Sequence, residues 1–158
     1  MRAAATAIVL RVKTLWNVDV QNDVLARIGR LRPDTPPLWG SLSCVQMVVH
    51  ITDAFALYTG ELVCAVKRTP LQYAPLKQLV VYVLPMPKNV PTAAVLKARI
   101  AEDWPSEVSR LERAVRAFAE QRNRDEWPPH PLFGSLSRAA YGVLAYKHTD
   151  HHLRQFGT

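Results

Sequence analysis

The spacing of apolar residues along this chain predicts four long helices. In four stretches, apolar side chains recur every three or four residues, which is the period of one helix face. We expect these helices over residues 19–31, 43–59, 103–123 and 137–157. The second stretch is apolar on nearly every face, so we expect it to be surrounded by protein.

Residues that start and stop helices agree with these stretches. Ser43 and Gln46 are spaced as a capping box at the start of the second helix, and Gly60 supplies its stop. Three prolines follow the first helix, and Pro105 falls in the first turn of the third, where proline is tolerated. The four helices are therefore separated by defined breaks.

A long connection joins the second and third predicted helices. Residues 62–101 contain five prolines, and the apolar run 76–84 within them fits either a short helix or a strand. Connections of this length are usually functional or packed over a site. The pattern as a whole predicts an all-α protein, a four-helix bundle with a long connection between helices two and three. Residues 1–13 fit no element, so we expect a loosely held N-terminal extension before a bundle domain over 14–158.

Composition places the chain among ordinary globular proteins. Its 158 residues are 49% hydrophobic and 21% charged, enough for one domain with a real core. The net charge of +7 could favour an acidic partner. However, the basic residues are scattered and do not alternate with aromatic ones, which argues against a nucleic-acid partner.

Cysteine usage and the first residues bear on the compartment. Two cysteines, Cys44 and Cys64, are too few for a disulfide framework, and neither belongs to a CxxC pair. Cys44 falls inside a predicted helix, where a small buried thiol is expected. The apolar run 3–10 is too short to span a membrane and lacks the features of a signal peptide. We therefore expect no membrane association and a cytoplasmic location.

The last predicted helix carries three of the five histidines within five residues. His148 and His152 are four residues apart, so they project side by side and can offer two imidazoles to one metal ion. His151 is a neighbour of this stripe, and Gln155 returns to within about 20° of the His148 direction. The alternative is a polar patch near a helix end, where histidines suit the helix dipole. A metal would need a third ligand from elsewhere in the chain.

His50, in the middle of the apolar second helix, is the candidate for that ligand. A buried histidine must find a partner or lower stability, and a hydrogen-bonded core histidine is the other interpretation. Metal sites in bundles form between helices, from side chains that point inward. His50, His148 and His152 together would leave one coordination position open, and both zinc and nickel suit imidazole. His130, among three prolines in 128–131, fits either a structural hinge or a site residue.

Several segments carry a resemblance to a known family. They are Leu38-Trp39-Gly40, residues 46–50, residues 87–92, residues 129–134 and residues 146–157, which contain an HxxHHLRQFG motif. Over about residues 13–157 the chain resembles the DinB-like (DinB/YfiT) superfamily, and within it an uncharacterised bacterial branch. The resemblance implies a bundle whose long crossover lies between helices two and three. It also implies a metal triad of one histidine in the second helix and an HxxxH pair in the fourth, which matches His50, His148 and His152.

The resemblance further implies a class of chemistry. Characterised members of the superfamily include metal-dependent S-transferases that use a thiol cofactor and a thiol-dependent isomerase. We accordingly expect a divalent metal, zinc or nickel, that activates a low-molecular-weight thiol or water for attack on a small-molecule substrate, as a thiol S-transferase or a hydrolase-type enzyme. Asp53, His151 and Gln155 are the candidates to support the ligands.

A non-catalytic protein is the alternative: a ligand-binding or oligomeric helical module whose metal site is vacant or decayed. Val143, Tyr146 and Leu153 lie on the side of the last helix opposite the histidines. Such a helix needs cover on both sides, from the long connection or from a second subunit. On this ground we expect a homodimer, and the sequence leaves open whether the protein is an enzyme.

Overall fold

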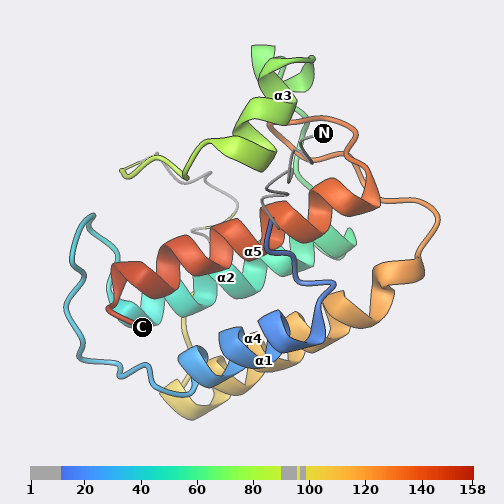
Figure 1. The fold of residues 1–158 in the computed structure, drawn as a ribbon. Coiled ribbons are helices and arrows are strands. Elements are labelled where there is room, and N and C mark those ends of the chain that lie inside the picture. Colours follow the sequence, from blue (N-terminus) through green and yellow to red (C-terminus); the bar gives the residue numbers. More distant parts are fainter. Residues whose placement is uncertain (1–11, 90–95, 97–98) are drawn as a thin grey trace, which may run out of the picture.

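The computed structural model describes residues 12–89, 96 and 99–158, so residues 1–11 of the predicted N-terminal extension lie outside the described residues. Within the described residues the chain forms five α-helices and no strand (Figure 1). The predicted all-α class is therefore confirmed.

Four of these helices are long, and they correspond to the four predicted stretches. They are α1 (Val18–Ile28), α2 (Cys44–Thr59), α4 (Trp104–Glu120) and α5 (Arg138–Gln155). Helix α2 packs against α4 and α5, and α1 packs against the same two helices (Figure 1). The histidine-bearing helices α2 and α5 are thus neighbours.

The helix starts follow from the capping residues. Ser43 accepts a hydrogen bond from the backbone N–H of Gln46, whose side chain accepts one from the Ser43 N–H, so the capping box is confirmed. Asp103 and Ser137 cap α4 and α5 more simply. The side chain of each accepts one hydrogen bond from a backbone N–H, that of Ser106 and that of Ala140 respectively. Gly60 ends α2 with a φ of 86°, a left-handed conformation that glycine adopts without strain.

Three helices end earlier than the apolar spacing predicts, and α5 does so by the smallest margin, at Gln155 rather than at residue 157. Helix α1 stops at Ile28, and Leu31 reaches the core from a turn in which its N–H donates to the Ile28 carbonyl. Helix α4 stops at Glu120 and continues as a 3₁₀ turn, Gln121–Asn123. Apolar spacing indicates which side chains are buried. Because a tight turn can bury a side chain as a helix does, spacing alone does not mark where the helix ends.

The core lies between the four long helices, with large apolar side chains from each. Its most deeply buried members include these residues: Val24, Ile28, Met47, Val48, Ile51, Phe55, Leu111, Val115, Phe118, Tyr141 and Leu153. Ten of the sixteen residues of α2 are buried, as its all-round apolar character predicts. The His50 side chain therefore sits within packed protein.

The segment before α1 packs closely across α5. The Leu15 N–H donates to the carbonyl of Gly142, and the Trp16 indole N–H donates to that of Arg138. A Cβ placed on Gly142 would lie 2.2 Å from Trp16 Nε1 and 2.4 Å from Thr14 Oγ1. Only glycine leaves room for this crossing.

The connection between α2 and α4 is partly helical. It contains a 3₁₀ turn (η1, Pro70–Gln72), one turn of α-helix (α3, Leu76–Gln78) and a π-helical turn (η2, Leu79–Val83). The apolar run 76–84 is therefore helical rather than a strand. The predicted crossover topology stays a prediction, since residues 90–95 and 97–98 lie outside the described residues.

A single lysine of α5 holds the π-helical turn. The Lys147 ammonium donates hydrogen bonds to the carbonyls of Val80, Val81 and Leu84, at 2.7, 2.9 and 2.6 Å. Burial lowers the pKa of this lysine. All three donors of the ammonium are therefore engaged by the connection.

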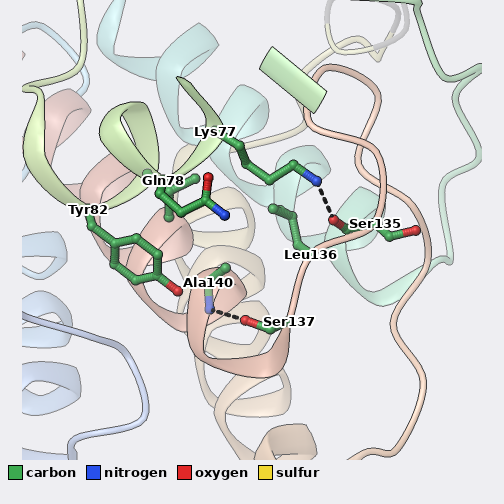
Figure 2. Close-up of a pocket in the computed structure, with 8 residues that line it drawn as sticks. Lys77, Gln78, Tyr82, Ser135, Leu136, Ser137 and Ala140 are labelled. Atoms are coloured by element: carbon green, nitrogen blue, oxygen red, sulfur yellow. Dashed lines mark hydrogen bonds between the residues drawn. The ribbon is translucent and has the colours of Figure 1, made fainter. Parts of the chain in front are cut away.

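Beside this contact, α3 and η2 leave a small cavity against the start of α5. Its volume is about 210 Å³, and its walls come from Lys77, Gln78 and Tyr82 on one side and the 135–140 segment on the other (Figure 2). Lys77 closes one end by donating to the Ser135 carbonyl, at 2.9 Å (Figure 2). The connection thus contacts α5 through Lys147 and the loop before α5 through Lys77.

The side of α5 opposite the histidines is covered within the chain. Val143, Tyr146 and Leu153 are each at most 6% exposed. This feature therefore does not require a second subunit, and the homodimer stays a prediction. Among the described helices, none is long and apolar enough to cross a membrane.

Candidate metal centre

Three histidines from two helices meet at one point between α2 and α5. His50 is buried in the middle of α2, while His148 and His152 stand one turn apart on α5. The Nε2 atoms of His50 and His148 are 3.1 Å apart, and the His152 ring centroid lies 4.9 Å from that of His50 and 5.0 Å from that of His148. One ring nitrogen of each lies within 4.8 Å of the other two. The predicted histidines are thus brought together.

The tautomer of His152 is set by a chain of two hydrogen bonds. The Gln155 amide donates through Nε2 to the carbonyl of Trp39, at 2.6 Å, so its oxygen must face the other way. That oxygen lies 2.8 Å from His152 Nδ1 and can only accept, so Nδ1 carries the proton. The Nε2 lone pair of His152 is therefore available to a metal.

The segment around Trp39 lies tightly against the end of α5. The Leu38 N–H donates to the backbone carbonyl of Gln155, at 2.8 Å. Gly40 has a φ of 79°, and a Cβ there would lie 2.7 Å from the Gln155 amide nitrogen. A glycine at residue 40 therefore lets the loop approach closely enough to orient the amide.

Tyr58 supports His148, the other candidate metal ligand on α5. Its hydroxyl lies 2.8 Å from His148 Nδ1. The hydroxyl is buried, and burial raises its pKa, so it stays protonated near neutral pH. A neutral hydroxyl can donate to Nδ1 or accept from it, so it serves either tautomer of His148. When it accepts, His148 Nε2 is free to bind a metal.

Burial keeps the imidazoles of His148 and His152 neutral. It lowers the pKa of His148 well below its usual value, and the other histidines lower it further. Burial also lowers the pKa of His152, to about 3, with His50 as the next cause. Metal ligation requires the neutral form, so at neutral pH neither ring would first have to lose the extra proton of an imidazolium.

Two other predicted site residues have different surroundings. The Asp53 carboxylate accepts a hydrogen bond from Arg99, at 3.0 Å, and Arg99 also bonds the buried Glu107, at 2.7 Å. Asp53 is thus part of an ion-pair network that joins α2 to α4. The ring of His151 packs edge-on against Trp39 and lies next to His152, with centroid distances of 5.6 and 5.1 Å.

His130 makes hydrogen bonds that stabilise the turn in which it lies. Its Nδ1 accepts hydrogen bonds from the backbone N–H groups of Leu132 and Phe133, which closes the proline-rich turn. Its ring packs near Tyr58, with centroids 5.9 Å apart. Burial lowers the pKa of His130 to about 4, so the ring is neutral at pH 7.

Sequence reasoning missed Tyr58 and the carbonyl of Trp39. Tyr58 lies two turns after His50 on the same helix, a spacing that could have suggested contact with the same partner helix. The Trp39 carbonyl leaves no mark in the sequence, because any residue supplies a carbonyl. Only the glycine that follows it hints at a close backbone approach.

Comparison with known proteins assigns a family. A family model described as "Protein of unknown function (DUF1569)" matches residues 76–158, more than half of the chain. The chain belongs to this DUF1569 family. The DUF1569 match contains α5 with His148 and His152, whereas His50 precedes it. Searches of curated proteins and of solved structures found no match for this DUF1569 protein.

Proposed function

We propose that this DUF1569 protein binds a divalent metal through His50, His148 and His152. In this proposal the metal activates a low-molecular-weight thiol or water toward a small-molecule substrate. The observation that carries the proposal is the convergence of three imidazole nitrogens, with His50 at least 98 residues before the two histidines of α5 in the chain. Such a set of donors within 4.8 Å of one another is what a three-histidine centre requires.

The donor set fits zinc or nickel. Two nitrogens bound to one tetrahedral zinc lie about 3.3 Å apart, given zinc–nitrogen distances near 2.0–2.1 Å. The 3.1 Å between His50 and His148 is close to this value. Three neutral nitrogens leave at least one coordination position for another ligand, which is typical of catalytic centres.

The chain supplies the support that such a centre needs. Gln155 fixes the tautomer and orientation of His152, and Tyr58 holds His148. A divalent metal bound here would lower the pKa of a thiol or water and supply it as a nucleophile. The resemblance to DinB-like proteins, with their crossover bundle, supports the thiol S-transferase form of this proposal over the hydrolase-type form.

The alternative is a non-catalytic bundle. Its supporting observation is the 3.1 Å contact between His50 Nε2 and His148 Nε2, which a proton on one nitrogen satisfies as an ordinary hydrogen bond. In that case the histidines form a buried polar network, and the protein serves as a ligand-binding or oligomeric module.

Metal content separates the two proposals. The protein is purified without a histidine tag, and zinc and nickel are measured by elemental analysis. We expect about one metal per chain in the wild type and in His151→Ala, the matched control on the same helix, and less than a tenth of that in His148→Ala. Equal metal in both variants, or metal-free wild type after incubation with zinc, would exclude the three-histidine centre.

Catalysis has its own test. Transfer of cysteine to 1-chloro-2,4-dinitrobenzene, followed by absorbance, reports thiol S-transfer. We expect a rate above background that requires both metal and His148. A metal-loaded protein that accelerates neither this transfer nor ester hydrolysis would support the non-catalytic alternative.

A further inference from the structure

A second feature of α5 lies beside the metal centre: a cleft on the neighbouring face of the helix. Its volume is about 500 Å³, within the range of small-molecule pockets. One wall is formed by Lys147, Asp150, His151 and Arg154, which fall on one face of α5. The opposite wall comes from Trp39 and the segment 85–88. Three separate segments therefore build it.

The walls combine apolar surface with positive charge. Trp39, Pro85 and Met86 supply the apolar part. Lys88 lies over the Trp39 ring, with its ammonium 4.2 Å from the ring centroid, and Arg154 stands across the cleft on α5. A ligand with an apolar body and a negative group matches both kinds of surface.

The charges of the lining residues leave a positive excess. Among the described residues that line the cleft, Asp150 alone is acidic, and Arg27 already pairs with its Oδ1 at 2.7 Å. Arg154 contacts the other oxygen of Asp150 through Nε alone, at 2.9 Å, and its side chain is 68% exposed. The two terminal nitrogens of the Arg154 guanidinium therefore remain able to bind a carboxylate through paired hydrogen bonds. Lys147, also in the lining, adds charge but no donor, since three carbonyls engage it.

The cleft is connected to the metal centre through shared residues. Trp39, which forms its apolar wall, also supplies the carbonyl that orients Gln155 and, through it, His152. His151 lines the cleft and lies beside His152, with ring centroids 5.1 Å apart. A ligand that moves Trp39 would therefore change the surroundings of one metal-binding ring.

We propose that this cleft binds a small organic anion with a flat apolar body, such as an aromatic carboxylate, and that it holds the substrate of the adjacent centre. The ligand class follows from the cleft alone. The role as a substrate pocket rests on the metal-dependent function proposed above.

Binding of 2-naphthoate to the zinc-loaded full chain, measured by isothermal titration calorimetry, tests the ligand class. Its neutral analogue, 2-naphthamide, has the same body without the charge. We expect naphthoate to bind about fivefold more tightly than the amide, and Arg154→Gln to remove that difference. Arg113→Gln, which removes the same charge from an exposed position of α4, is the matched control and should leave binding unchanged.

Equal binding of acid and amide would overturn the proposal, as would equal effects of the two arginine variants or no binding at millimolar concentration. The same titration on chelator-treated wild type separates this proposal from the metal centre. Arg154-dependent binding that persists without metal supports the cleft whether or not the metal proposal holds. Naphthoate binding that requires zinc but not Arg154 places the anion on the metal and overturns the cleft.

Discussion

The Gln155 amide joins a loop carbonyl to a histidine ring, a link that residue spacing could predict only in part. Spacing places Gln155 near the direction of His148, yet the side chain bonds His152, three residues before it. Residues three apart on a helix are also neighbours, so the spacing allowed Gln155 to contact either His148 or His152. The Trp39 carbonyl decides between the two orientations of the amide, and no side-chain pattern reports a backbone group.

Replacement of Gln155 by methionine tests its effect on the metal centre. Methionine has a similar length but offers His152 Nδ1 no oxygen, so the ring loses the bond that fixes its tautomer. We expect zinc affinity to fall about 10-fold to 100-fold, as for other groups that orient metal-bound histidines. Competition against a chromogenic chelator measures the affinity.

Thermal unfolding of this variant in the presence of EDTA supplies the control. If Gln155→Met keeps the wild-type zinc affinity while its metal-free stability falls, the amide supports only the fold.

His130 predicts a pH dependence of stability. Its pKa is about 4 in the folded chain and near 6.5 in the unfolded one, so between these values the unfolded chain binds the extra proton. Stability from this residue is therefore full above pH 6.5 and declines as the pH falls toward 4, by up to about 1.4 kcal/mol per pH unit. We expect His130→Asn, whose side-chain oxygen can still accept from the Leu132 N–H, to have a shallower decline. Urea unfolding in EDTA from pH 7.5 to 4.5 measures both slopes, and parallel slopes would contradict the assignment.

At the scale of the element, α5 was the most predictable helix of the chain. It also makes a contact with Trp16 that the sequence did not predict. Its start and its histidine face were predicted from residue spacing, although the helix ends two residues before the predicted residue 157. Gly142, in the middle of the helix, reads as a weak point because glycine lowers helix stability. In the structure it is the place where Trp16 crosses α5.

Alanine at residue 142 should therefore destabilise the protein despite its better helix propensity. Its Cβ would overlap the Trp16 indole and displace the segment before α1, and overpacking of this kind costs about 1–3 kcal/mol. Gly29→Ala is the matched control, because Gly29 is in a right-handed helical conformation and a Cβ there meets its nearest atoms at 3.7 Å. Urea unfolding should rank Gly142→Ala below wild type and Gly29→Ala at or above it; the same rank for both would show that the crossing is not tight.

At the scale of the whole molecule, periodicity was sufficient for the fold class and for the helices that carry the histidines. It could not place the turn that buries Leu31, nor choose between helix and strand for residues 76–84. Both depend on contacts with distant segments: the core in one case, and Lys147 in the other. The convergence of His50 with the α5 histidines needed the packing of α2 on α5, which the bundle interpretation supplied.

Zinc should stabilise the whole fold, because its ligands come from two helices that meet only in the folded chain. At a concentration a hundredfold above the dissociation constant, the gain is about 2.7 kcal/mol, or a rise of about 5–10 °C in Tm for a chain of this size. EDTA should reverse the rise, and His148→Ala should show none. A wild-type Tm unaffected by zinc would contradict a metal that joins α2 to α5.

The three carbonyls that converge on Lys147 give the attachment of the connection an unusual property. One ammonium supplies every donor, so acetylation of the amine, which leaves a single N–H, would remove at least two of the three bonds in one step. Lys147 is next in sequence to His148, so this attachment of the connection to α5 lies beside the triad. A single chemical event at one side chain would therefore weaken the attachment between two segments that are more than sixty residues apart.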